Sequence, residues 1–194
     1  IVDPTGRVVF GASNFTSDGG ELTLGVAGTY TVVIEGRASA TGASAFTFNV
    51  VPIADREVTL AVGAAVVDRI EHAGQRVRYR FDLAADARLL FDALSNSPSV
   101  SWSLDGPRGA VVTGRGFQAS DSLDISGNPL LVLPAGSYVL TIDGSADFTG
   151  NYGFRLLDIA TATAFGADEV VTGFLSVRGL GSATLALPSG APLE

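Results

Sequence analysis

A repeated strand sequence constrains this chain more than any other feature. Residues 28–36 read Gly-Thr-Tyr-Thr-Val-Val-Ile-Glu-Gly, and residues 136–144 read Gly-Ser-Tyr-Val-Leu-Thr-Ile-Asp-Gly. In each copy a tyrosine and two aliphatic residues occupy alternate positions, which is the period-two pattern of a half-buried antiparallel strand. The same shift of 108 positions relates Phe46 to Phe154. The chain therefore repeats a unit of roughly a hundred residues.

This repeat divides the chain into one complete unit and two partial units. The complete unit is expected at 53–160. Residues 1–52 match its C-terminal half, with Gly6 corresponding to Gly109, and residues 161–194 match its N-terminal part, with Val170 corresponding to Val66. A partial unit cannot bury its apolar face alone. We therefore expect the two parts either to complete each other within one chain or to pair with neighbouring chains.

The pattern of the complete unit predicts an all-β fold, an antiparallel β-sandwich or jelly roll. Short alternating segments are separated by turns rich in Gly, Pro, Asn and Asp, and no segment keeps a helical period over three turns. The first strand is expected at 64–70. The inward-facing residues predicted to form the core are Val77, Tyr79, Phe81, Leu89, Phe91, Val100, Trp102, Leu104, Tyr138, Leu140, Ile142, Tyr152, Phe154 and Leu156.

Composition excludes several classes of function. The net charge of −8 argues against nucleic acid as a partner, because phosphate binding requires a basic face. The chain has no cysteine, which excludes disulfides, zinc–thiolate sites and cysteine nucleophiles. No apolar run approaches the 18 or so residues of a membrane-spanning helix. The start at Ile1, without a signal peptide, indicates an internal piece of a longer protein.

Four ordered segments carry a resemblance to a known family. They are Arg-Tyr-Arg-Phe at 78–81, Leu-Asp-Gly-Pro-Arg-Gly at 104–109, Leu-Pro-Ala-Gly-Ser-Tyr at 133–138 and Gly-Asn-Tyr-Gly-Phe at 150–154. This set resembles the bacterial pre-peptidase C-terminal domain, which occurs as repeats in large secreted and surface proteins. The resemblance implies a jelly-roll-like sandwich without fixed catalytic residues, and some relatives resemble calcium-dependent or polymer-binding modules.

The sequence offers little for catalysis. His72 is the only histidine and lies in a polar turn, where we expect a solvent-exposed loop residue. No Gly-x-Ser-x-Gly nucleophile motif is present. The twenty acidic residues supply carboxylate pairs of the kind used in glycoside hydrolysis, but spacing alone selects none of them. The chain is therefore predicted not to be an enzyme.

A repeated acidic motif suggests a calcium site. Ser-Asp-x-x-Asp/Glu occurs at 17–21 and again at 120–124. Ca²⁺ takes six to eight oxygen ligands, which such loops can gather. The candidate ligands are Asp18, Glu21, Asp121, Asp124 and Asn128. The alternative is that Asp18 and Asp121 only cap turns through their side-chain oxygens.

An arginine stripe, Arg76, Arg78 and Arg80, is the candidate ligand-binding feature. A guanidinium group suits planar anions, so the stripe could bind an acidic polysaccharide. The alternative is a solvated strand face paired with nearby acids, which protects an edge from aggregation. Trp102 could stack on a sugar, but its alternation with Val100 and Leu104 favours a core position.

These observations predict a structural role. The chain is expected to be a non-catalytic repeat segment of a large extracellular bacterial surface protein, an adhesin stalk or surface fibre that spaces or presents other domains. Its partners would be neighbouring repeats of the same or like chains. The alternative is a carbohydrate- or matrix-binding accessory module of a secreted enzyme, with polysaccharide as ligand and Ca²⁺ as cofactor.

Overall fold

The structure is a computed structural model that describes residues 1–14, 19–120, 129–166, 169–172 and the backbone of 183–185. The chain forms two compact units, Ile1–Pro52 and Ile53–Glu194. No α-helix occurs in the described ranges, as the absence of a helical period predicts, and two 3-10 turns are present, Phe117–Ala119 and Ile159–Thr161. No helix of this part of the chain is long and apolar enough to cross a membrane.

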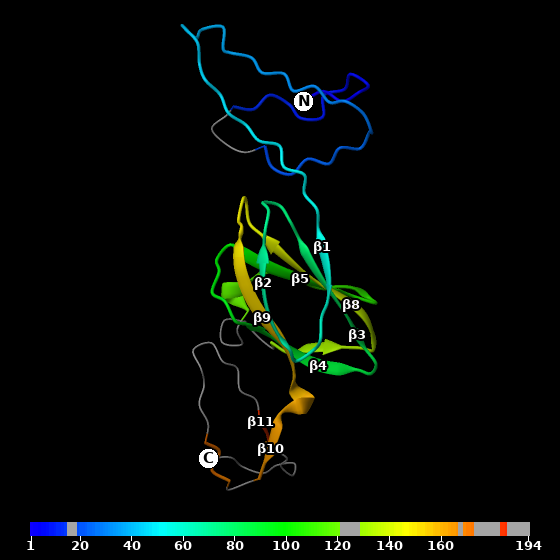
Figure 1. The fold of residues 1–194 in the computed structure, drawn as a ribbon. Coiled ribbons are helices and arrows are strands. Elements are labelled where there is room, and N and C mark those ends of the chain that lie inside the picture. The colour runs from blue at the N-terminus through cyan, green and yellow to red at the C-terminus, as the bar shows by residue number, and fades with distance from the viewer. Residues whose placement is uncertain (15–18, 121–128, 167–168, 173–182, 186–194) are drawn as a thin grey trace. The chain divides into compact units, whose positions relative to one another are not determined.

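The longer unit contains a β-sandwich of two sheets, which confirms the predicted fold class (Figure 1). The first sheet has the order β1-β3-β8-β5-β6, with β1 Arg56–Thr59, β3 Val77–Leu83, β8 Gly136–Gly144, β5 Val100–Gly106 and β6 Gly109–Gly116. The second has the order β2-β9-β4-β7, with β2 Ala65–Ile70, β9 Gly150–Asp158, β4 Ala87–Ala93 and β7 Leu131–Leu133. Every neighbouring pair is antiparallel except β1 and β3.

The core between these sheets consists of the residues that alternation predicts. None of the fourteen predicted inward side chains is more than 5% exposed. Phe91 stacks on Trp102 at 4.1 Å between ring centroids and on Phe154 at 5.3 Å. Such offset aromatic contacts add to the stabilisation from burial alone. Trp102 is fully buried, which confirms its predicted core position.

The structure adds one strand that the sequence pattern does not reveal. The predicted first strand, 64–70, is β2, but β1 precedes it and pairs in parallel with β3, with Val58 opposite Tyr79. The sequence of β1, Arg-Glu-Val-Thr, has a single aliphatic residue, so its alternation is too short to recognise. β1 lies at the edge of its sheet, where one side needs no strand partner.

Three segments of the N-terminal unit are bridged in the same order as three strands of the sandwich. The amides of Val2 and Thr31 each donate to the carbonyl of the other at 2.9 Å, and Val2 also forms a bridge with Val8. By the repeat, Val2 matches the end of β5, and Thr31 corresponds to Val139 of β8, which pairs with Asp105 of β5. The order Thr31, Val2, Val8 is thus the order β8, β5, β6.

Two side-chain arrangements also recur between the units. The Tyr30 hydroxyl donates to the carbonyl of Val26 at 2.6 Å, and the Tyr138 hydroxyl donates to the carbonyl of Pro134 at 2.7 Å, in each case four residues back. The glycine two residues before each tyrosine has a positive φ, +144° at Gly28 and +147° at Gly136. A Cβ atom at Gly28 would lie 2.6 Å from Cγ of Pro4, and at Gly136 it would lie 2.8 Å from Cγ of Pro107.

The 28–36 segment nevertheless differs from the half-buried strand that its sequence predicts. Only Thr31 takes part in a β-bridge, and Val32 and Ile34 are 43% and 36% exposed. Their counterparts Leu140 and Ile142 are fully buried. The reason is a missing neighbour, because no described residue of the N-terminal unit corresponds to β3, which pairs with β8 in the sandwich.

Beyond the sandwich, a second parallel pair forms. β10, Thr163–Phe165, pairs in parallel with β11, Ala183–Leu185, with Thr163 opposite Ala183. By the shift of 104 positions, Ala183 corresponds to Tyr79 and Leu185 to Phe81, so β11 corresponds to β3. β10 and β11 are parallel, as β1 and β3 are, but the shift of 104 places β10 at positions 59–61, and its register is displaced by one residue, since Thr59 lies opposite Arg80 in the sandwich.

Candidate functional site

The arginine stripe lies on the first sheet, and each of its members forms an ion pair. Arg78 and Arg80 are on β3, and Arg76 directly precedes it. The Arg76 Nε donates to Asp143 at 3.1 Å, and a terminal nitrogen of Arg78 lies 2.7 Å from a carboxylate oxygen of Asp55. Arg80 binds Glu57 through two hydrogen bonds, of 2.9 and 2.6 Å.

These ion pairs engage the guanidinium groups that an anionic ligand would use. The pairing is electrostatically consistent, since the hydrogen bond from Arg80 lowers the pKa of Glu57 below its ordinary value. A polysaccharide carboxylate would have to compete with Asp55, Glu57 and Asp143 for these arginines. The geometry is that of a strand face with its own counter-charges.

Most of the candidate calcium ligands lie outside the described residues. This holds for Asp18, Asp121, Asp124 and Asn128. Glu21 is described and is exposed. Within the described ranges, no group of three or more His, Cys, Asp or Glu side chains is close enough to hold a metal ion. The calcium site stays a prediction.

His72 is exposed in the turn between β2 and β3, as expected. Its carbonyl accepts a hydrogen bond of 3.1 Å from the amide of Gln75. The Gln75 side chain, 5% exposed, accepts from the amide of Glu71 and donates to the carbonyl of Ala54. The residues around His72 thus close a turn.

A polar cluster that the sequence analysis did not single out joins the two sheets. We define it as Arg56 on β1, Asp68 on β2, Tyr79 on β3 and Tyr152 on β9. Arg56 and the Tyr79 hydroxyl each lie 2.6 Å from an oxygen of Asp68. The hydroxyls of Tyr79 and Tyr152 are 2.7 Å apart. Each sheet contributes two members, so these bonds connect the layers of the sandwich at one point.

The electrostatics of the polar cluster favour a structural role over a chemical one. Burial opposes ionisation of Asp68, but hydrogen bonds from Arg56 and Tyr79 outweigh it and keep the pKa of Asp68 below its ordinary value. Burial, together with the neighbouring carboxylate, raises the pKa of Tyr79, and burial also raises that of Tyr152. A general base needs a pKa near the working pH, which none of these groups has.

Two signals in the sequence could have located the polar cluster. Asp68 has the same strand parity as Val66 and Ile70, so alternation places its carboxylate on the inward face of β2. Tyr79 and Tyr152 stand at predicted core positions, and a buried tyrosine hydroxyl usually finds a hydrogen-bond partner. The link between these residues depends on which strands face each other, and local pattern does not specify that.

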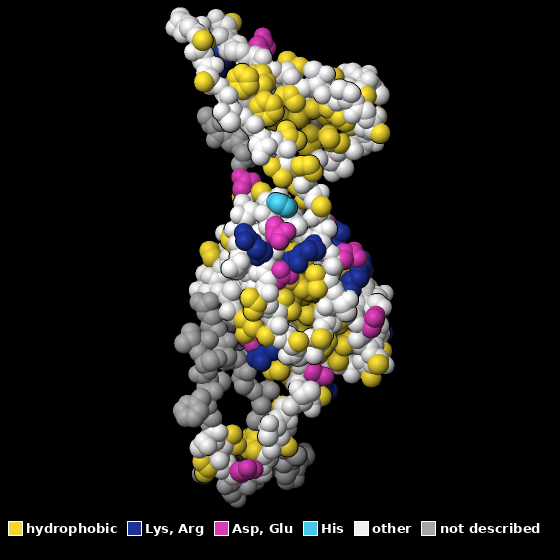
Figure 2. Space-filling view, viewed as in Figure 1, with side chains coloured by type: hydrophobic (Ala, Val, Ile, Leu, Met, Phe, Trp, Pro, Cys, Tyr) yellow, Lys and Arg dark blue, Asp and Glu magenta, His cyan; other side chains and the backbone are white. Residues whose placement is uncertain are grey.

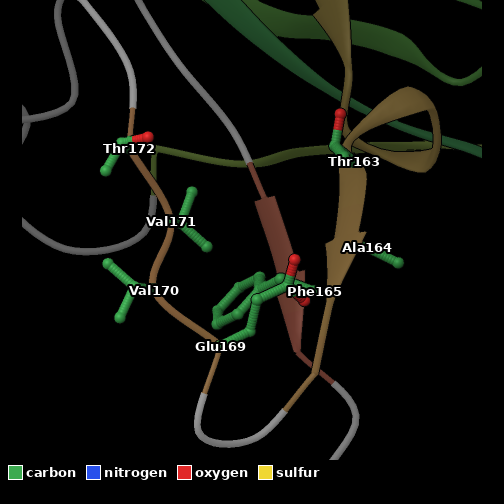
Figure 3. Close-up of a pocket in the computed structure, with 7 residues that line it drawn as sticks. All are labelled: Thr163, Ala164, Phe165, Glu169, Val170, Val171 and Thr172. Carbon is green, nitrogen blue, oxygen red and sulfur yellow. The ribbon is translucent and has the colours of Figure 1, made fainter.

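The described part of the chain also contains a hollow of about 240 Å³ beside β10, lined by Thr163, Ala164, Phe165, Glu169, Val170, Val171 and Thr172. Figure 3 shows the Phe165 ring between β10 and the 169–172 segment. The Gly166 amide donates a hydrogen bond of 2.7 Å to the Glu169 carboxylate. The lining of the hollow combines apolar side chains with two threonines and a single carboxylate, Glu169, which already accepts the Gly166 amide.

No family model and no curated protein sequence matches the chain. Among solved structures, it is similar to PliG from Salmonella Typhimurium, a periplasmic inhibitor of g-type lysozyme, with 18% identity and a TM-score of 0.41 over 53% of this chain and 98% of that chain. It is also similar to the pre-peptidase C-terminal domain of a Bacillus anthracis collagenase, with 13% identity and a TM-score of 0.38 over 56% and 99%.

The second of these structures is a domain of the kind that the sequence motifs resemble. At such identities and TM-scores, neither likeness indicates a function.

Proposed function

We propose that the chain is a non-catalytic structural repeat segment of a large extracellular bacterial surface protein. The segment acts as part of an adhesin stalk or surface fibre and spaces or presents other domains. The repeat boundaries are those of the sequence, with a complete unit at 53–160 between partial units at 1–52 and 161–194.

The observation that carries this proposal is the recurrence of the same local structure in two units. The tyrosine bond to the carbonyl four residues back and the positive-φ glycine against a proline both appear at 4–30 and at 107–138. Neither detail involves a ligand, and both fix backbone geometry. Repetition of scaffold details without repetition of a reactive group is typical of a protein that acts through its shape.

The polar side chains of the complete unit support the same role. The three arginines of the stripe are engaged by carboxylates of their own sheet. The polar cluster satisfies its hydroxyls internally, and its tyrosines are unsuited to proton transfer at neutral pH. The side chains of the stripe and of the polar cluster are therefore paired with groups of the same unit.

Glycan-array binding tests the proposal against the carbohydrate-binding alternative. We expect the 194-residue chain to give no reproducible signal on arrays of neutral and acidic polysaccharides. Binding that is lost in Arg78→Ala and retained in Arg88→Ala would contradict the structural role, because it would locate a ligand site on the stripe. Arg88 is a suitable control because it is exposed on β4, in the other sheet.

A further inference from the structure

The N-terminal unit exposes an apolar face. Its large hydrophobic residues that are at least 36% exposed are Val8, Leu24, Val26, Val32, Val33, Ile34, Phe46, Phe48, Val50 and Val51. Figure 2 shows hydrophobic side chains gathered on the face of this unit that is turned toward the viewer. We call Tyr30, Val32, Ile34, Phe46 and Phe48 the acceptor face.

The counterparts of the acceptor face form the centre of the complete unit. They are Tyr138, Leu140, Ile142, Phe154 and Leu156, none more than 1% exposed. In the acceptor face, Phe46 and Phe48 are 54% and 49% exposed and stack at 6.4 Å between ring centroids. Exposed apolar residues whose counterparts form a core mark an interaction surface.

The backbone of residues 30–32 forms hydrogen bonds on one side only in the part of the chain that the structure describes. Thr31 uses both its amide and its carbonyl to bond Val2. Tyr30 and Val32 face the other side of the strand, and in the described structure neither forms a backbone–backbone hydrogen bond. In the complete unit that side of β8 pairs with β3, with Tyr79 opposite Leu140 and Phe81 opposite Tyr138.

The chain carries a strand pair of the type that this edge requires. β10 and β11 are parallel, as β1 and β3 are, and we call them the donor pair. Among the described residues, β11 has a strand partner on one side only. Val170, which lines the hollow beside β10, corresponds by the repeat to Val66, which packs against the core of the complete unit.

We propose that the acceptor face of one copy binds the donor pair of a second copy and so completes a sandwich between two chains. β11 adds antiparallel to residues 30–34, and β10 lies on its outer side. The repeat sets the register, with Val32 opposite Ala183, Thr31 opposite Thr184 and Tyr30 opposite Leu185. This inference rests on the proposed structural role and names the partner through which repeats join.

The topology of the sandwich favours a second copy over the same chain. Arg56 lies beside Val77, at the end of the sandwich where β2 finishes. Asp158 is opposite Leu89, at the far end of β9, whose first residue Gly150 pairs with Ile70. The chain therefore enters and leaves the sandwich at opposite ends, about 25–30 Å apart along a nine-residue strand.

One short connection leads into the sandwich, and another leads out of it. Residues 53–55 join the N-terminal unit to β1, and residues 159–162 join β9 to β10. Each can span only about 10–15 Å. Because the acceptor precedes the sandwich in the chain and the donor follows it, each copy carries one of each, which suits head-to-tail contacts that generate open chains or rings.

Light scattering on the intact 194-residue chain tests the inference. We expect a mass that rises with concentration above 19.8 kDa. Val32→Asp should block the acceptor, and Thr184→Pro should block the donor because proline has no amide hydrogen for the strand ladder. Each variant alone should remain a monomer, and a mixture of the two should give a heterodimer and nothing larger. The control Val67→Asp changes a valine that is 83% exposed on β2 and should associate like the unmodified chain.

The fluorescence of the single tryptophan, Trp102, reports whether the sandwich remains folded in each variant. A monomer at every concentration, or a mixture that fails to associate, would overturn the inference. A monomer that is also silent on the glycan array would leave the proposed structural role in place. A chain that associates but binds a glycan through Arg78 would retain the inference and lose the proposed function.

Discussion

At the scale of single residues, one glycine in each unit fixes how the chain enters the repeated strand. Gly136 has φ +147°, a conformation that L side chains rarely adopt, and it packs against Pro107. Gly28 does the same against Pro4. The two units share this arrangement because the backbone requires it. A side chain at either glycine would be strained at this φ and would collide with the proline ring.

Substitution of Gly136 by alanine should therefore destabilise the complete unit. We expect a loss of about 1–3 kcal/mol in the free energy of unfolding, the usual cost of a strained backbone position. Urea unfolding followed by Trp102 fluorescence measures it. The matched control is Gly116→Ala, where φ is −67° and a Cβ atom would meet nothing within 4 Å. Equal stability of the two variants would contradict the argument.

The polar cluster makes a second prediction at this scale, on pH. The folded-state pKa of Asp68 is depressed from 3.8, so its ionised form stabilises the fold above the unfolded pKa. That contribution is lost as the pH falls below about 4 and through the lower, folded-state pKa. Urea unfolding between pH 2.5 and 7 should show a stability difference between the unmodified chain and Asp68→Asn that is largest near neutrality and shrinks in acid. A difference that grew in acid would contradict this assignment.

At the scale of strands, the alternation of apolar and polar residues was sufficient to predict the inward-facing side chains wherever a strand had both a buried face and a solvent face. It identified the inward residues of β3, β5, β8 and β9, and all of them are buried. It failed for β1, whose four residues offer one aliphatic position. It also failed to predict that Asp68 and Tyr79 meet, because contacts between sheets depend on how the strands stack.

The 28–36 segment shows a different limit of sequence reasoning. Its pattern is that of a half-buried strand, and its counterpart β8 is one. Yet Val32 and Ile34 remain exposed, because burial of a strand face requires neighbours that the pattern itself does not supply. The alternation in residues 28–36 indicates which face the segment would bury if a neighbouring strand were added.

The repeated acidic motif makes a prediction at the level of loops. If Asp18 and Asp121 only cap turns, thermal unfolding of the chain should occur at the same temperature in EDTA and in millimolar Ca²⁺. A ligand that binds only the folded state would stabilise it by about 2.7 kcal/mol at a hundredfold excess over Kd. A rise in Tm that disappears in Asp121→Ala would instead place a calcium site at residues 120–128.

At the scale of the whole molecule, the proposed assembly forms the strand arrangement of the sandwich a second time, between two copies of the chain. In that assembly the N-terminal unit supplies the part equivalent to β5, β6 and β8, and β10 with β11 supplies the part equivalent to β1 and β3. Each copy would carry one acceptor and one donor, which suits head-to-tail association.

Disulfide trapping tests whether the two partial units are complementary halves. The chain has no cysteine, so a mixture of Thr31→Cys and Thr184→Cys chains can form a disulfide only between the two introduced residues or between identical chains. These positions correspond to Val139 and Arg80, which are paired in the sandwich. Directly opposed strand residues lie within the Cα separation of about 4.4–6.8 Å that a disulfide requires.

We predict a disulfide-linked heterodimer from this mixture, and little from Thr31→Cys with Thr163→Cys, because β10 should lie one strand further away. Equal trapping of both pairs, or no heterodimer with Thr184→Cys, would contradict the account. Trapping only within single chains that carry both Thr31→Cys and Thr184→Cys would show that the halves meet inside one molecule, against the proposed assembly.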